Sequence, residues 1–188
     1  MLLGFLAAAL FALPLALLVV HWRTFGLFLS PALDFARYIP VPALVPLSII
    51  WIGVGESQKV AVLFVGTFFQ LLVMTADAVR RVPLYHTESA LTLGVPRRNL
   101  ALSVLLPAAS PQIYDACRVC IGLTWSYVMV AELVASERGI GYGIIRAQRF
   151  LQTDQIIVSV IALGLIGIAY DRIFVSTKAL WFPWDDGK

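Results

Sequence analysis

Long apolar runs separated by short polar stretches dominate the pattern of hydrophobic and polar positions along this chain. Four runs are mostly apolar, and the few charges that they contain lie near their ends: they cover residues 1–20, 59–76, 113–134 and 155–170. Each is close to the length that a helix needs to cross a bilayer, about 20 apolar residues. The first ends in His21–Arg23, an aromatic and a cation of the kind found at membrane interfaces. The pattern predicts membrane-spanning helices.

A further apolar stretch, at residues 39–57, is interrupted by prolines at positions 40, 42 and 46 and stops at Gly53 and Gly55. Prolines at this density prevent one straight helix. Broken backbone at membrane depth is tolerated only against protein or a water-filled cavity. The stretch therefore predicts either a gate or the kinked, packed start of a helix, and the residues alone leave both open.

Polar residues near the runs predict several local features. Ser30 and Pro31 are suited to cap and open a short interfacial helix that reaches about Tyr38. Asp115 and Arg118 lie one helical turn apart, which predicts a local ion pair. The final run is expected to end at residue 170, and the tail after it predicts a separate amphipathic segment at the interface.

Composition supports an integral membrane protein. The 188 residues are 60% hydrophobic and only 13% charged, and the mean hydropathy is +0.88. Soluble domains are near half apolar and about a quarter charged. The length suits about five spans in a single transmembrane domain over residues 1–188. The fold class expected is therefore an all-α, polytopic membrane helical bundle. The net charge of +3 is small, and its arginine pairs flank apolar runs, so no nucleic-acid partner is expected.

The polar interruption at residues 88–107, ESALTLGVPRRNLALSVLLP, is patterned too specifically for an ordinary loop. Its order of residues predicts a short surface helix, a turn at Gly94 and a second helix opened by Pro96. Glycine permits the positive φ of a tight corner between helices. Proline at the first helical position loses only an N–H that has no helical partner there.

This pattern resembles the EAA motif of binding-protein-dependent ABC importer permeases: Glu-Ala-Ala, then a spaced Gly, then Ile-x-Leu-Pro. Ser at the second position and Val104 in place of Ile are conservative departures. In that family the first helix of the motif is a cytoplasmic coupling helix that docks on a separate ATPase subunit. The resemblance therefore implies a role in ATPase coupling for Glu88, Ser89, Ala90, Gly94, Leu106 and Pro107. The alternative, a loop whose residues only cap helices, requires all the spaced positions to coincide by chance.

The proline-rich stretch is similar to one branch of these permeases, which serves nitrate, sulfonates, taurine and bicarbonate. Residues 42–47 and the W-x-G-x-G-E pattern at residues 51–56 carry this likeness. The resemblance implies a multi-pass protein of the bacterial inner membrane that needs no cofactor. Its implied partners are cytoplasmic ATPase subunits, an extracytoplasmic substrate-binding protein, membrane lipid and a second permease chain, expected to be an identical copy.

The centres of the spans contain no fixed charge, which predicts a passage rather than a high-affinity site. Selectivity and energy would then come from other subunits. Candidate residues of the translocation path are Pro40, Pro42, Gln70, Thr124, Ser126 and Glu132. Two of them have equally good alternatives: the amide of Gln70 suits a helix–helix hydrogen bond, and Glu132 suits a structural role near a membrane boundary.

Motifs for other functions are weak or missing in this sequence. No GxxxxGK[ST] or HExxH occurs, so neither P-loop ATP hydrolysis nor a conventional zinc site is expected. Cys117 and Cys120 form a C-x-x-C in an apolar helix, where small buried residues are the better interpretation. GIGYG, at residues 139–143, lacks the context of a phosphate loop and is expected to open a short helix. A membrane-embedded enzyme or scaffold remains the alternative to transport.

The distribution of cations predicts the orientation. If the segment at residues 88–107 is cytoplasmic, alternating spans place Met1 outside and the C-terminus inside. Ten of the 14 Lys and Arg residues then fall inside, counting Arg37 among them, and four fall outside, as the positive-inside rule requires. The family normally begins inside and crosses once before the segment that residues 3–10 resemble. We therefore expect the family's first span to be missing from this sequence.

Overall fold

The computed structural model describes residues 1–135 and 138–185. These residues form helices and connecting turns without a strand, which confirms the all-α prediction. The α-helices are α1 Leu2–His21, α2 Arg23–Arg37, α3 Val41–Ile52, α4 Glu56–Arg80, α5 Leu84–Thr92, α6 Leu106–Ala135, α7 Ile140–Arg149 and α8 Thr153–Trp181. Between α5 and α6 lie a 3₁₀ turn, Arg97–Asn99, and a π-helical stretch, Ala101–Leu105.

Four helices in the described residues are long and apolar enough to cross a membrane. They are α1, α4, α6 together with the π-helical stretch before it, and α8. The pair α2 and α3 makes a fifth span if it is counted as one, although it is bent by 90° at its break. The prediction of about five spans agrees with this arrangement.

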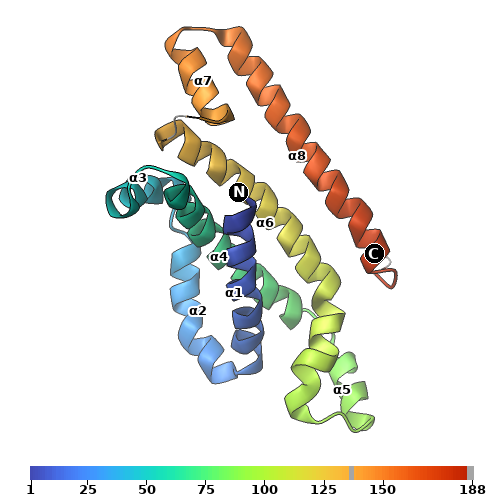
Figure 1. Ribbon diagram of the computed structural model, residues 1–188. Helices are drawn as coiled ribbons and strands as arrows, with labels where there is room; N and C mark the ends of the chain where they lie inside the picture. The colour runs from blue at the N-terminus through green and yellow to red at the C-terminus, as the bar shows by residue number, and fades with distance from the viewer. Residues whose placement is uncertain (136–137, 186–188) are drawn as a thin grey trace.

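Helix α4 lies at the centre, packed between α1 and α6 (Figure 1). Small residues allow α1 and α4 to approach closely: Ala8, Ala12 and Ala16 are fully buried. A Cβ at Gly4 would come within 2.8 Å of the Cβ of Leu63. Without water to drive helices together in a bilayer, such close packing of small residues stabilises their association.

Helix α2 begins earlier than the sequence predicted. It starts at Arg23, so Pro31 lies inside it and Ser30 is no cap. Pro31 lacks the N–H that would reach the carbonyl of Leu27, and the Ser30 hydroxyl donates to that carbonyl instead, at 3.4 Å. The proline is therefore tolerated, and the predicted interfacial helix was wrong at its start.

Helix α8 also differs from the prediction. It continues past residue 170 to Trp181, so the aromatic tail up to there is no separate segment. The charges on this extension pair with α6: Arg118 holds Asp171 through two hydrogen bonds of 2.6 and 2.7 Å, and Lys178 donates to Asp115 at 2.6 Å. The predicted pair between Asp115 and Arg118 is therefore wrong, because each has a partner on α8.

Charged residues of α4, α6 and α8 lie at one level of the bundle. We call this set the charged belt: it comprises Asp77, Arg81, Asp115, Arg118, Asp171 and Lys178. The apolar parts of these helices extend from the belt in one direction, and α5 lies beyond it in the other (Figure 1). The belt therefore marks one boundary of the membrane-embedded part.

Candidate functional site

The segment with the EAA-like pattern forms a helix that projects from the end of the bundle. Helix α5 contains Glu88, Ser89 and Ala90, and it stands apart from the long helices (Figure 1). Glu88 and Ser89 are exposed, whereas Ala90 is buried. The pattern of the three residues thus gives the helix one packed face and one free face with a carboxylate on it.

Gly94 ends this helix in the conformation that the sequence predicted. Its φ is +85°. The N–H of Val95 bonds the carbonyl of Ala90 at 3.0 Å, and the N–H of Gly94 bonds that of Leu91 at 3.0 Å. These two bonds make a Schellman motif, in which the left-handed position after the helix suits glycine. The chain reverses here because only a residue without a Cβ adopts this φ easily.

The return to the bundle is less regular than predicted. Pro96 has extended dihedrals and precedes only the 3₁₀ turn, so it does not open the second helix. The chain then passes through the π-helical stretch into α6, whose first residues are Leu106 and Pro107. Leu106 packs against the apolar cluster around Val79 and Val82, which ties the segment to the end of α4.

The free surface around α5 is apolar with basic residues beside it. Its exposed large side chains are Leu84, Tyr85, Leu91 and Leu93, and the exposed Arg97 and Arg98 follow. Leu93, which stands at the tip of the turn, is 84% exposed. An apolar projection of this kind, rimmed by charge, has the composition of a docking surface.

The second candidate feature is a cavity at the break between α2 and α3. It has a volume of about 370 Å³, and its walls come from the α2–α3 corner, α4 and α6. Pro40, Pro42 and Gln70 line it together with Tyr127. Pro40 caps α3 and Pro42 lies in its first turn, so the prolines set the break that opens the cavity. Three of the predicted path residues therefore lie together.

The other predicted path residues lie elsewhere. Thr124 is fully buried between α4 and α6: its hydroxyl contacts that of Thr67 at 2.8 Å and donates to the carbonyl of Cys120 at 2.7 Å. Ser126 is exposed on α6. Neither lines the cavity, so Thr124 acts as a helix–helix contact in this conformation. Cys120 is buried beside it, as the sequence suggested.

Glu132 has a structural partner. Its carboxylate accepts a hydrogen bond of 2.9 Å from the N–H of Gly141, in the first turn of α7. A carboxylate at this place satisfies a free N–H and interacts favourably with the helix end. Gly139, at φ +118°, gives the carboxylate room, and α7 begins directly after it, as expected for GIGYG. Residues 136–137, between α6 and this turn, lie outside the described residues.

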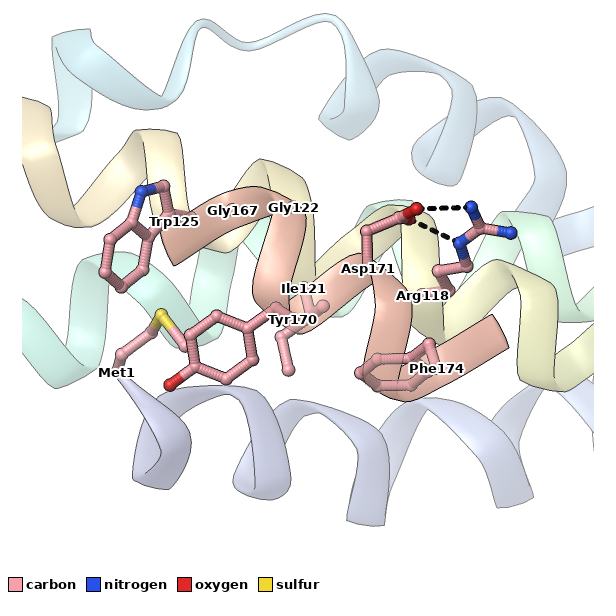
Figure 2. Close-up of a pocket in the computed structure, with 9 residues that line it drawn as sticks. All are labelled: Met1, Arg118, Ile121, Gly122, Trp125, Gly167, Tyr170, Asp171 and Phe174. Carbon is pink, nitrogen blue, oxygen red and sulfur yellow. Dashed lines mark hydrogen bonds and ion pairs between the residues drawn. The ribbon is translucent and has the colours of Figure 1, made fainter. Parts of the chain in front are cut away.

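A smaller pocket of about 130 Å³ lies between α6, α8 and the start of α1 (Figure 2). The rings of Trp125, Tyr170 and Phe174 form much of its wall, and the Arg118–Asp171 pair lies at one end (Figure 2). Its apolar walls fit packing between helices and lipid rather than a polar solute.

Arg37 lies at a different depth from the one that the sequence predicted. It was counted as cytoplasmic, yet it lines the cavity at the α2–α3 break. The misplacement follows from the wrong start of α2: a helix from Arg23 carries Arg37 away from the His21 end by roughly 21 Å, at 1.5 Å per residue.

Comparison with known proteins identifies the class. Residues 1–175 match a family model described as "Binding-protein-dependent transport system inner membrane component". A putative ABC transporter permease protein of Methanocaldococcus jannaschii is 37% identical over 182 residues, which cover 96% of this chain and 68% of the relative. The chain therefore belongs to the family of binding-protein-dependent inner-membrane components and is a multi-pass permease subunit of an ABC importer.

Further relatives have names that state a solute. A putative aliphatic sulfonates transport permease protein of Escherichia coli is 34% identical over 157 residues, which cover 84% of this chain and 60% of the relative. The bicarbonate transport system permease protein of Synechococcus elongatus is 32% identical over 179 residues, which cover 95% and 64%. The names of these relatives agree with the branch of permeases that the proline-rich stretch resembles.

The fold also matches a solved transporter. A chain of the MetNI methionine ABC transporter, from a study of its inward facing conformations, superposes with a TM-score of 0.72 at 21% identity. The match covers 92% of this chain and 88% of that chain. At this identity the likeness shows the importer permease fold alone.

Proposed function

We propose that this chain forms the translocation path of an ATP-driven importer for a small anion such as a sulfonate, taurine, nitrate or bicarbonate. The names of the relatives that transport sulfonates and bicarbonate support this solute class. A soluble binding protein on the outside would deliver the anion, and cytoplasmic ATPase subunits would supply the energy. The sequence itself contains no P-loop, so the ATPase is expected to be a separate chain.

The observation that carries the proposal is the projecting helix α5 with its Gly94 corner. An exposed apolar helix held by a Schellman turn and anchored through Leu106 is suited to transmit a rigid displacement. A push on α5 would reach α4 and α6 at the charged belt, because the segment joins these two helices directly. We infer that Glu88 and Ser89, on the free face of α5, contact the ATPase, while the buried Ala90 and the turn at Gly94 hold the helix in position.

A second copy of this chain is the expected partner inside the membrane. Helix α3 presents Ile50 and Trp51, which are 78% and 75% exposed, and α8 has no buried residue. Lipid and a second permease are both suitable neighbours for such surfaces. In a pair, the cavity at the α2–α3 break would contribute to a path between the two copies.

One experiment separates this function from that of a membrane-embedded enzyme or scaffold. The chain is co-expressed with the ATPase and binding protein encoded beside it, purified and reconstituted in vesicles. Uptake of labelled taurine, ethanesulfonate, nitrate and bicarbonate is then measured. We expect the ATPase to co-purify and at least one anion to accumulate only with ATP and the binding protein. An isolated permease that binds no ATPase would overturn the proposal.

A further inference from the structure

The cavity at the α2–α3 break lies near the middle of the membrane. Gln70, on its α4 wall, is ten residues from the end of α4 at Arg80, roughly 15 Å at 1.5 Å per residue. Tyr127, on its α6 wall, is nine residues from Arg118 in the charged belt, roughly 14 Å. The apolar core of a bilayer is ~30 Å thick, so both walls place the cavity at about half depth.

Arg37 is the one charged residue among the described residues that line this cavity. The remaining lining is apolar except for the hydroxyls of Tyr38 and Tyr127 and the amide of Gln70. A cation at this depth is costly unless it faces protein or water, and such residues commonly mark the path of a solute or ion. Arg37 therefore calls for a functional explanation that the sequence did not suggest.

The guanidinium of Arg37 is oriented by its neighbours but is not fully used by them. Its Nη2 donates to the hydroxyl of Tyr38 at 3.3 Å and lies 3.5 Å from a carboxylate oxygen of Asp34. The guanidinium carbon also lies 5.0 Å from the centre of the Tyr38 ring. Good charge-assisted bonds are about 2.7–2.9 Å long, so the contact with Asp34 is loose. Arginine has five N–H donors, and both polar contacts involve only one nitrogen.

The N-terminal end of α3 offers fewer free N–H donors at this place than an ordinary helix start. Pro42 has no N–H, and the N–H of Ala43 already donates to the carbonyl of Pro40 at 2.9 Å. Arg37 is thus the one side chain with a full positive charge on the cavity wall, among the described residues.

We propose that Arg37 selects for anions in the middle of the permease, by binding the oxyanion of the passing solute in the cavity at the α2–α3 break. The proposal rests on the proposed import of a small anion and adds a specificity-determining residue to it. A planar guanidinium suits a sulfonate, carboxylate or nitrate, because each presents oxygens that can accept two parallel N–H bonds. The binding protein would choose among anions, and Arg37 would exclude cations from the path.

The competing explanation is that Asp34 neutralises Arg37 and that the pair only stabilises α2. The two explanations differ in the potential inside the cavity. A neutralised pair would leave the electrostatic potential of the cavity near zero, whereas a selecting Arg37 makes that potential positive. Asp34 does not line the cavity, and its side chain is 59% exposed. Both observations favour a positive cavity with a selecting Arg37.

The potential can be measured with charged thiol reagents. Gln70→Cys places a thiol on the cavity wall of the permease in complex with its ATPase, in vesicles. Two reagents modify this thiol: anionic sulfonatoethyl methanethiosulfonate and cationic trimethylammonioethyl methanethiosulfonate. Each rate of modification is divided by the rate of the same reagent with a free small thiol, and the two quotients give the normalised anion-to-cation ratio. The chain without Gln70→Cys gives the background from Cys117 and Cys120. We then combine Gln70→Cys with one further substitution at a time: Arg37→Gln, Arg37→Lys or the charge control Arg172→Gln.

We expect the normalised anion-to-cation ratio to exceed one with Arg37 present. Arg37→Gln should lower it at least about fivefold, as the loss of a nearby charge predicts, while Arg37→Lys and Arg172→Gln should leave it nearly unchanged. A ratio near or below one with Arg37 present, no reaction with either reagent, or an equal effect of Arg172→Gln would overturn the proposal. The first of these outcomes needs no Arg37 variant, so a misfolded variant does not block the test. Failure of the import function itself would show separately, as missing ATP-dependent uptake.

Discussion

Gly94 has the strictest backbone requirement of the α5 segment. Its φ of +85° and the two hydrogen bonds that close the Schellman motif leave the chain one direction in which to return to α6. Nothing lies within 4 Å of a Cβ built at this glycine, so the requirement comes from the backbone and not from crowding. A substitution there tests the corner without disturbing a packed neighbour.

Gly94→Val is expected to lose ATPase assembly or coupling while the spans still insert. The left-handed conformation costs about 1–2 kcal/mol for an ordinary residue and more for a β-branched one. ATPase activity and uptake of the reconstituted complex measure the effect. Gly94→Asn, which tolerates this conformation, should be milder, and Gly164→Val, at an open helical position of α8, is the control. Normal coupling in Gly94→Val would show that the corner is not required.

Glu88→Lys is expected to impair coupling more than Glu88→Ala does. Glu88 is exposed on α5, where a carboxylate could pair with a basic residue of the ATPase. Alanine only removes that pair, whereas lysine places two cations together. ATPase stimulation by the loaded binding protein is the measurement. If both variants behaved alike, the contact would depend on shape and not on charge.

At the scale of helices, the sequence predicted the features that depend on neighbouring residues. It missed the contacts that depend on residues far away in the chain. The end of α5 at a glycine, the start of α7 and the existence of the spans follow from neighbouring residues or from apolar length. The position of Arg118 does not: its partner Asp171 is 53 positions away, and only the packing of α8 on α6 brings them together. The start of α2 was missed because a Ser30 hydroxyl satisfies the carbonyl freed by Pro31.

The sequence predicted one part of the candidate site, the α5 segment, but not how the cavity is assembled. The residues proposed for the ATPase contact, at the α5 segment, are local in sequence, so a motif could identify them. The cavity brings together the α2–α3 corner, α4 and α6, and no sequence spacing shows that Gln70 faces Pro40 and Pro42 while Thr124 faces Thr67. The depth of Arg37 in the membrane could not be predicted either, because it depends on where α2 begins.

The Thr67–Thr124 contact offers a test of packing between α4 and α6. Because the Thr124 hydroxyl donates to the carbonyl of Cys120, it accepts from Thr67. Thr124→Val therefore leaves the Thr67 hydroxyl without its partner and should lower stability by about 1–2 kcal/mol, while Thr67→Val should cost less. The double variant should cost less than the sum of the single ones, as thermal unfolding in detergent can measure. Additive effects would mean that the two hydroxyls do not interact.

For the whole molecule, we expect the choice of solute and its passage to depend on different subunits. Gln70→Ala is expected to change the uptake rate more than the order of preference among taurine, ethanesulfonate, nitrate and bicarbonate, because the binding protein makes the choice. Uptake by the reconstituted importer measures both quantities. Thr124→Ala should behave similarly, through its effect on packing. A reversed order of preference with the same binding protein would place the choice among these anions in this chain.

The central claim is that α5 contacts a separate ATPase, and site-specific cross-linking tests it most directly. A photoreactive group is placed at Glu88→Cys, on the free face of α5, and at Val160→Cys, which lies exposed in the apolar part of α8. Both variants are expressed with the ATPase encoded beside the chain and irradiated in native membranes. We predict a covalent product with the ATPase from position 88 and none from position 160. No product from position 88, in a complex that still transports, would contradict the account.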